Sequence, residues 1–494
     1  MPTDSTHDSA VALRARLMSA AAGDVALPRV GILWSRLRLR LPRTRIALGP
    51  VPGQIALASL MLCALALVLF STSGPNALVP RSNEVFPGWE SGPLHLLSNG
   101  LPNNVYTLSY GFSVLLVVML LAYGVTLAAA RSLSTRVVVG SVILLHVILL
   151  MSPPLQLEDV FNYLGYARLG ALHGMNPYTH VIGSEAYDPI YRFVTWHHLH
   201  SPYGPLFTAA SYLLPLGSLA WSYWILKVVT VVASLGFLAL VWRCARLLGR
   251  DPRFALVFVA LNPIYLVWAV GGFHNDFFML VPAMAAVALL LVRRDRAAGA
   301  VLMLAVAVKF SAILLLPFLL VGVWPVRERL RQILEGAVIG AVPLAALSIA
   351  LFGFSLPNLQ DQSTLLTNFS VPNTVGLVFG VGGTPALLRL FDLAAVAVVL
   401  WLLWRRRDWV ADAGWATLAL LMTLAWLMPW YVIWVAPLAA IGSSVRLRRA
   451  TLLFTLFIIV TFLPALGIFL SNHGIYPLST KAGKASSALM RKLV

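Results

Sequence analysis

Long stretches of apolar residues that contain no Asp, Glu, Lys or Arg recur along this chain. A helix needs about 20 such residues to cross the hydrocarbon core of a bilayer. Six stretches approach or exceed this length, namely 51–69, 109–130, 137–151, 255–272, 414–441 and 450–469. Weaker stretches lie at 223–242, 277–292, 299–323, 333–353 and 386–404. We therefore predict an all-α polytopic integral membrane protein with about 11–13 membrane segments, some of them short or re-entrant.

The charge balance agrees with a membrane protein and disfavours a nucleic-acid partner. Only 11% of the 494 residues are charged, whereas a soluble protein would have about a quarter. The net charge of +18 comes from basic residues between the apolar stretches, where the positive-inside rule places cytoplasmic loops. We expect the lipid bilayer to be a partner and nucleic acid not to be one. Cys63 and Cys244 lie in apolar segments, and we expect both to be packing residues.

Three parts of the chain differ in composition. Residues 1–50 are rich in Arg and are predicted to form a basic cytoplasmic segment beside anionic lipid. Residues 51–472 are predicted to form a single transmembrane domain, and 473–494 a C-terminal tail. We see no cleaved signal peptide. The predicted location is the plasma membrane, crossed many times, with the N-terminus in the cytoplasm and the functional site facing the outside or periplasm.

The basic patches limit how the apolar stretches can cross. Stretch 299–323 lies between the patches 293–296 and 327–331, which both belong on the cytoplasmic side. It must therefore enter and return on one side, and we predict two short helices that turn near Lys309. By the same reasoning, 205–219 is a short or re-entrant element. Broken helices are tolerated only inside protein or beside a wet cavity, so a cavity should lie on the outer side.

Two outer loops stand out, 153–204 and 354–385. The first is long and polar and contains five of the ten His residues of the chain. A loop of this length inside a compact protein is usually functional. We therefore place the site in loop 153–204.

The segment LEDVFNYLGYARLGALHGMNPYTH, residues 157–180, predicts an amphipathic helix in this loop. Asp159, Tyr163 and Tyr166 recur at i, i+4 and i+7, so they share one face of the helix. Gly174 is expected to end it. A carboxylate in a first turn can simply stabilise the helix dipole by about 0.3–1 kcal/mol, and this structural role weighs evenly against a functional one for Asp159.

Two further polar features interrupt apolar sequence. In VGGFHNDFF, residues 270–278, the side chains of His274, Asn275 and Asp276 follow two glycines, which suits a tight turn aimed into the cavity. A solvated turn is the alternative, because Asn-Asp is common turn chemistry. Lys309 lies among apolar residues, where an ammonium costs about 2.5–3.5 kcal/mol. A functional role for Lys309, such as neutralising a phosphate, is therefore favoured over snorkelling.

The segment HHLHSPYGPLF, residues 197–207, leads into the next helix, and Pro205 suits the first turn of that helix. Its histidines, among them His198 and His200, are candidates to contact a phosphate or a sugar. For any single loop histidine, simple packing or solvation is the commoner case.

The chain lacks the motifs of several large enzyme and pump classes. It contains no P-loop, no G-x-G-x-x-G dinucleotide motif, no G-x-S-x-G elbow and no H-E-x-x-H helix. We also see no clear internal repeat of the kind that secondary transporters have. One long asymmetric outer loop that carries most of the polar chemistry fits an enzyme better than a carrier.

Four segments together resemble a known family of membrane enzymes. These are NPYTH, SPYGPLF, NPIYLVWAVGGFHND and AVAVKFSAILLLP, together with the acidic pair Glu158-Asp159. The combination resembles the GT-C membrane glycosyltransferases and, more narrowly, the actinobacterial polyprenyl-phosphomannose-dependent alpha-1,6-mannosyltransferases that extend lipomannan. The resemblance covers roughly residues 50–470. One departure is Glu158, where an Arg or Ser would be expected before the Asp.

The resemblance implies an all-helical fold with its site in an outward-facing cavity. It also implies a polyprenyl-phosphate-linked sugar as donor, most often mannose, and a glycan or glycolipid as acceptor. For inverting transfer, Asp159 is predicted to be the general base. The predicted donor phosphate-binding residues are Lys309, His274, His198 and His200. The predicted sugar- or acceptor-binding residues are Tyr163, Tyr166, Asn275, Asp276 and Tyr203.

No metal site and no required cofactor are predicted, although Asp276 would be the residue to hold a divalent ion if one is used. Two alternatives stay open. A flippase or carrier of polyprenyl-linked sugars would use the same cavity without a base, and a GT-C transferase could use another sugar such as arabinofuranose. A ligase with a diphosphate donor is disfavoured because Arg is scarce in the outer loops.

Overall fold

Helices form the regular structure of the part of the chain that can be described. The computed structural model describes residues 48–80, 85–357 and 365–475, and within these ranges it contains no strand. Five helices there are long and apolar enough to cross a membrane: α3 (Pro50–Ser71), α5 (Val105–Ala129), α9 (Leu219–Leu247), α14 (Arg327–Phe352) and α17 (Pro385–Arg405). Helices α20 (Val445–Thr461) and α21 (Pro464–Asn472) form a sixth candidate, bent by 52°. The prediction of an all-α polytopic membrane protein is confirmed.

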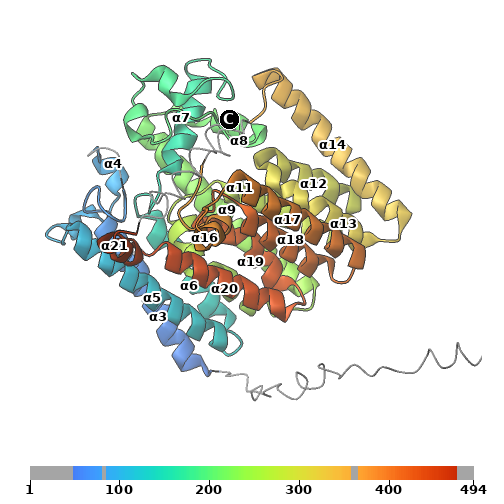
Figure 1. The fold of residues 1–494 in the computed structure, drawn as a ribbon, viewed down its shortest axis with the longest axis horizontal. Coiled ribbons are helices and arrows are strands. Elements are labelled where there is room, and N and C mark those ends of the chain that lie inside the picture. The colour runs from blue at the N-terminus through green and yellow to red at the C-terminus, as the bar shows by residue number, and fades with distance from the viewer. Residues whose placement is uncertain (1–47, 81–84, 358–364, 476–494) are drawn as a thin grey trace, which may run out of the picture. The chain divides into compact units, whose positions relative to one another are not determined.

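Shorter helices fill the space between the long ones (Figure 1). The α-helices are α4 (Gly88–Ser91), α6 (Thr135–Leu150), α7 (Asp159–Ala171), α8 (Pro205–Ser211), α10 (Pro252–Ala260), α11 (Asp276–Leu291), α12 (Asp295–Val308), α13 (Leu315–Val323), α16 (Val371–Val378), α18 (Trp409–Thr423) and α19 (Val432–Ile441). The 3-10 helices are η1 (His95–Ser98), η2 (Ile182–Glu185), η3 (Tyr191–Phe193), η4 (Leu214–Leu216), η6 (Phe310–Leu314) and η7 (Pro429–Tyr431), and η5 (Tyr265–Val270) is a π-helix.

The broken elements lie where the sequence predicts them. Helix α12 ends at Val308, Lys309 has an extended backbone (φ −150°, ψ 117°), and η6 and α13 follow. The predicted division of this stretch into short helices near Lys309 is therefore confirmed, and the return to the same side of the membrane stays a prediction. The predicted short element at 205–219 is also confirmed, since α8 has only seven residues.

Three of the apolar stretches predicted as membrane segments are divided. Stretch 255–272 divides after α10, because Pro263 has no N–H for the helix ladder and the Asn262 side chain accepts a hydrogen bond from the Ile264 N–H (3.0 Å). Stretch 414–441 divides between α18 and η7, and stretch 450–469 divides between α20 and α21. A proline follows each break, at positions 263, 429 and 464.

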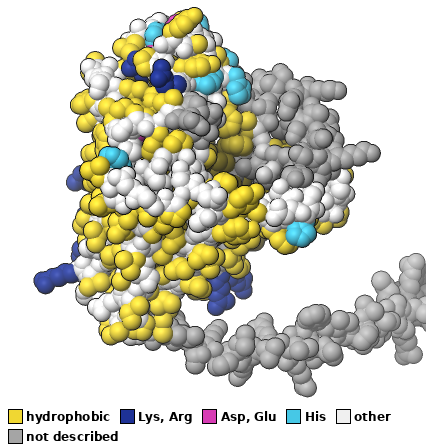
Figure 2. All heavy atoms as spheres, turned by 90° about the vertical axis from the view of Figure 1, so that its left-hand side faces the viewer, with side chains coloured by type: hydrophobic (Ala, Val, Ile, Leu, Met, Phe, Trp, Pro, Cys, Tyr) yellow, Lys and Arg dark blue, Asp and Glu magenta, His cyan; other side chains and the backbone are white. Residues whose placement is uncertain are grey.

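The long helices among the described residues carry many exposed apolar side chains. Hydrophobic side chains cover much of the face seen in Figure 2. On α17, Leu390 and Leu393 are more than half exposed, as expected for side chains that meet lipid tails. Cys63 and Cys244 are buried and free, which confirms that both are packing residues.

Helices α12 and α14 pack so closely that their backbones touch. A Cβ atom added to Gly336 would lie 1.8 Å from the carbonyl oxygen of Arg296, and one added to Gly299 would lie 2.0 Å from that of Ile333. Small residues permit such approach between membrane helices. At the end of this contact, Arg329 donates two hydrogen bonds to the buried Asp295 carboxylate (2.6 and 2.7 Å).

We predict that Gly336→Ala separates α12 from α14 and destabilises the protein by about 1–3 kcal/mol, as overpacking usually does. Gly124→Ala in α5 is the matched control, because nothing lies within 4 Å of the added Cβ atom there. Thermal unfolding in detergent or lipid should show a lower Tm for Gly336→Ala and an unchanged or slightly higher Tm for Gly124→Ala. Equal Tm values for the two variants would contradict the close contact.

Candidate functional site

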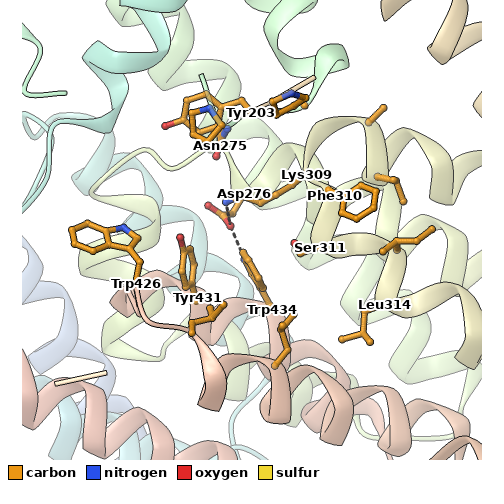
Figure 3. A pocket seen from close by; sticks show the side chains of 18 of the residues that line it. Tyr203, Asn275, Asp276, Lys309, Phe310, Ser311, Leu314, Trp426, Tyr431 and Trp434 are labelled. Atoms are coloured by element: carbon orange, nitrogen blue, oxygen red, sulfur yellow. Dashed lines mark hydrogen bonds and ion pairs between the residues drawn. The ribbon is translucent and has the colours of Figure 1, made fainter. Parts of the chain in front are cut away.

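One large cavity, of about 1220 Å³, lies among the short and broken elements. Most of its wall is apolar and comes from α12, η6, α14, α17 and α18. Polar residues gather at the start of α7, the start of α11 and the break between α12 and η6, and Asp392 of α17 adds a further carboxylate to the wall. Figure 3 shows several of them around a shared space.

Asp159 is the first residue of α7 and faces this cavity, with 17% of its side chain exposed. The segment before it is fixed by two backbone hydrogen bonds, from the Leu155 N–H to the Gly271 carbonyl (2.9 Å) and from the Gln156 N–H to the Leu78 carbonyl (2.8 Å). The first of these bonds joins the Asp159 segment to the turn that carries the predicted His-Asn-Asp group. The carboxylate of Asp159 consequently lies 3.4 Å from Nδ1 of His274.

The His-Asn-Asp turn is tight, as its two glycines predict. A Cβ atom added to Gly271 would lie 2.5 Å from the Val267 carbonyl oxygen, so only glycine fits without a shift. The ring of His274 is buried and stacks on Trp430, with centroids 3.6 Å apart and planes at 13°. The Tyr163 hydroxyl accepts a hydrogen bond from the Asn275 N–H (3.2 Å), which ties α7 to the turn.

Asp276 and Lys309 form an ion pair inside the cavity. The Lys309 ammonium donates to one Asp276 oxygen (2.8 Å), and the Trp434 indole N–H donates to the same oxygen (Figure 3). The other Asp276 oxygen is buried and has no hydrogen-bond partner among the described residues. Lys309 also lies over the rings of Tyr431 (5.4 Å) and Trp434 (5.1 Å). An ammonium has three donors, so Lys309 can bind a further anion.

The SPYGPLF segment supplies a hydrogen-bond donor to the helix end before Lys309. The Gly204 N–H donates to the Val308 carbonyl (3.0 Å), which the end of α12 leaves without a helical partner. A Cβ atom on Gly204 would lie 2.2 Å from the Ala307 carbonyl oxygen, so glycine is required for this contact. Two of the segments that carry the family resemblance therefore pack directly on each other.

Most of the predicted site residues come together. The cavity is lined by Asp159, Tyr163, Tyr166, Tyr203, Asn275, Asp276 and Lys309. His274 lies behind Asp159 as a buried contact. Helix α7 does not present a polar face to water, since most of its side chains are buried, and its Asp159–Tyr163–Tyr166 face borders the cavity instead. Among the described residues, no group of three or more His, Cys, Asp or Glu could hold a metal ion.

The two loop histidines predicted to bind phosphate, His198 and His200, do not line the cavity. Leu199 lines the cavity, whereas His198 and His200, which flank it, do not. Residues 197 and 198 form a turn, and the Tyr166 hydroxyl donates to the Leu199 carbonyl (2.7 Å). The structure therefore does not bring His198 and His200 together with Lys309 in the cavity lining.

Sequence reasoning missed the aromatic wall formed by Trp426, Trp430, Tyr431 and Trp434. These residues belong to the segment WLMPWYVIW, which was included in a membrane span. Pro429 within that segment was the available signal, because a proline flanked by aromatic residues indicates a break that can line a cavity. A second missed residue is Lys227 in α9, which is fully buried and donates to the Ser152 carbonyl (2.7 Å).

The outer loop that follows α7 is held by an ionic network. The Asp188 carboxylate accepts hydrogen bonds from Arg168 Nε (2.8 Å), from the Ile190 N–H (2.9 Å) and from the His173 ring (2.8 Å). Burial alone would raise the pKa of Asp188, but these three hydrogen bonds outweigh it and hold the pKa below the ordinary value. The network therefore stabilises the loop at neutral pH and loses this contribution only as the pH falls through the lowered pKa.

Comparisons with known proteins cover most of the chain. Residues 60–325 match the family described as "Alpha-(1->6)-mannopyranosyltransferase, N-terminal domain", and residues 364–490 match "MptB C-terminal domain". No solved structure matches the chain.

Individual relatives carry the same family name. An alpha-(1->6)-mannopyranosyltransferase A of Mycobacterium tuberculosis is 27% identical over 423 residues, which cover 75% of this chain and 79% of that protein. The protein of that name from Corynebacterium glutamicum is 29% identical over 187 residues, 34% of this chain and 35% of its own length. Because the N-terminal family match spans more than half of the chain, this multi-pass membrane protein belongs to the alpha-(1->6)-mannopyranosyltransferase family of glycosyltransferases.

Proposed function

We propose that this protein transfers mannose from a polyprenyl-phosphate donor to a glycan or glycolipid acceptor, forming an alpha-1,6 linkage at the outer face of the membrane. One observation carries the proposal. A single cavity is lined by a partly exposed carboxylate, Asp159, and by an ammonium, Lys309, and the rest of its wall is mostly apolar. The names of the relatives support mannose as the sugar and the alpha-1,6 linkage.

The apolar extension supports a lipid-linked donor. It is lined by Ala341, Leu344 and Ala345 of α14 and by Val396 and Leu400 of α17. Both helices are long enough to cross a bilayer. A polyprenyl chain could pass from the bilayer along these five side chains, because they are apolar and lose no hydrogen bond to water when a lipid covers them. A nucleotide would find no matching polar groups along these five side chains.

The proposed reaction is a single displacement. The oxygen of an acceptor hydroxyl attacks the anomeric carbon of the mannose while the bond from that carbon to the phosphate oxygen breaks. The hydroxyl proton passes to the Asp159 carboxylate, and polyprenyl phosphate leaves with the bonding electrons. Attack from the opposite side inverts the anomeric centre, so a beta-linked donor gives an alpha-mannoside.

The neighbouring groups assign Asp159 rather than Asp276 as the base. One Asp276 oxygen already accepts from Lys309 and Trp434, so that carboxylate is occupied by its partners. Among the described residues, Asp159 has an ion-pair contact with His274 alone, and it keeps part of its surface open to the cavity. Lys309 is proposed to bind the donor phosphate, whose charge grows as the bond breaks and is stabilised strongly in an apolar site.

Asp159→Asn should lower transfer by about 10²- to 10⁴-fold, the usual contribution of a general base, and leave donor binding intact. The assay uses purified protein in lipid, labelled polyprenyl-phosphomannose and a short alpha-mannoside. Glu158→Gln is the matched control, because a glutamine oxygen can still accept the hydrogen bond from Thr195 (2.8 Å in the wild type). Full activity of Asp159→Asn would reduce this residue to a helix-stabilising carboxylate.

Lys309→Met should slow transfer by about 10²- to 10³-fold, because the departing phosphate loses its cation. The variant also leaves the Asp276 carboxylate buried without its ion-pair partner, which destabilises the fold. The double variant Lys309→Met with Asp276→Asn separates the two effects. It should recover the wild-type Tm and remain slow, whereas recovery of transfer as well would show that Lys309 serves only to neutralise Asp276.

A further inference from the structure

The cavity has an aromatic side that the transfer chemistry described above does not use. Trp196 and Trp426 both line it, and their rings meet edge to face with centroids 5.8 Å apart and planes at 87°. Both indoles are partly exposed, and no hydrogen bond joins either indole N–H to a described residue. An indole N–H at the wall of a cavity usually has a hydrogen-bond partner. These two N–H groups can therefore donate to a ligand that binds in the cavity.

The backbone on each side of Trp426 is fixed by a single residue, Thr367. The Thr367 N–H and hydroxyl both donate to the Ala425 carbonyl (3.0 and 2.9 Å), and the Leu427 N–H donates to the Thr367 hydroxyl (2.8 Å). Trp426 therefore projects from a short loop that is held before and after it. Such fixed aromatic groups lose little conformational entropy when they bind a ligand.

Trp196 is tied to the start of the helix that carries the proposed base. The Thr195 hydroxyl donates to the Glu158 carboxylate (2.8 Å), and Thr195 and Glu158 are the chain neighbours of Trp196 and Asp159. This hydrogen bond joins the segment of Trp196 to the segment of Asp159, and both residues line the cavity. It also explains why the buried side chain of Glu158 does not cap α7.

The cavity wall across from Trp426, on the other side of Asp276 and Lys309, is apolar. In Figure 3, Phe310 and Leu314 lie on one side of Asp276 and Trp426 lies on the other. The apolar side continues between α14 and α17, where the donor lipid is proposed to enter. An acceptor must reach Asp159 without crossing the lipid, so it should come from the side of the two tryptophans.

We propose that Trp196 and Trp426 form the platform that binds the pyranose units of the acceptor glycan. The inference rests on the proposed function and adds the location and the mode of acceptor binding. A pyranose has apolar C–H faces that stack on aromatic rings, and its hydroxyls accept hydrogen bonds from a free indole N–H. Two perpendicular indoles offer separate faces, so the platform is suited to more than one sugar unit.

The test compares Trp196→Ala, Trp426→Ala and the double variant with wild type, using alpha-1,6-linked mannosides of one to three units. Each single variant should raise the KM for the trimannoside about tenfold, with little change in the KM for polyprenyl-phosphomannose. The preference of the wild type for the trimannoside over the monomannoside should also shrink. Trp404→Ala is the control, because Trp404 is 79% exposed and does not line the cavity.

Direct binding of the trimannoside, measured without donor by titration calorimetry on protein in nanodiscs, separates this proposal from the proposed function. If the wild type transfers mannose but the tryptophan variants keep its trimannoside KM and affinity, the platform is overturned and the function stands. If the wild type transfers nothing yet binds the trimannoside through these tryptophans, the function is overturned and the platform stands. Failure of the wild type to bind the trimannoside would overturn the platform.

Discussion

A bilayer leaves no water to bind an unpaired backbone group, and this constraint determines where the chain can be irregular. Two breaks in the helices are matched by groups from elsewhere in the protein. The Val308 carbonyl receives the Gly204 N–H, and the backbone beside Trp426 is bound by Thr367. Both breaks border the large cavity, which brings polar side chains into an apolar protein.

The same constraint shapes the charges of the site. A lone ammonium inside the apolar wall would be costly, so Lys309 is paired with Asp276 and lies over two aromatic rings. Asp159 is instead placed at the start of α7, where the helix dipole favours a carboxylate. The helix-stabilising and functional readings of Asp159 are thus compatible, since one position serves both.

Some of this arrangement could be predicted from the sequence. Basic patches on both sides of one apolar stretch required the turn at Lys309, and two glycines indicated the tight turn before Asp276. The contact of Asp159 with His274 could not be predicted, because it depends on a hydrogen bond between Leu155 and Gly271, far apart in the chain. The lining of the cavity by Leu199, and not by His198 or His200, could not be predicted either, since the sequence does not show that the Tyr166 hydroxyl binds the Leu199 carbonyl.

The central claim is that a lipid-linked sugar meets the base inside this cavity. The most direct measurement gives purified protein in lipid either labelled polyprenyl-phosphomannose or labelled GDP-mannose, with the same alpha-mannoside acceptor. We predict an alpha-linked product from the lipid donor alone, with one polyprenyl phosphate released for each mannose transferred. Product from GDP-mannose, or movement of the lipid donor across the bilayer without its consumption, would contradict it.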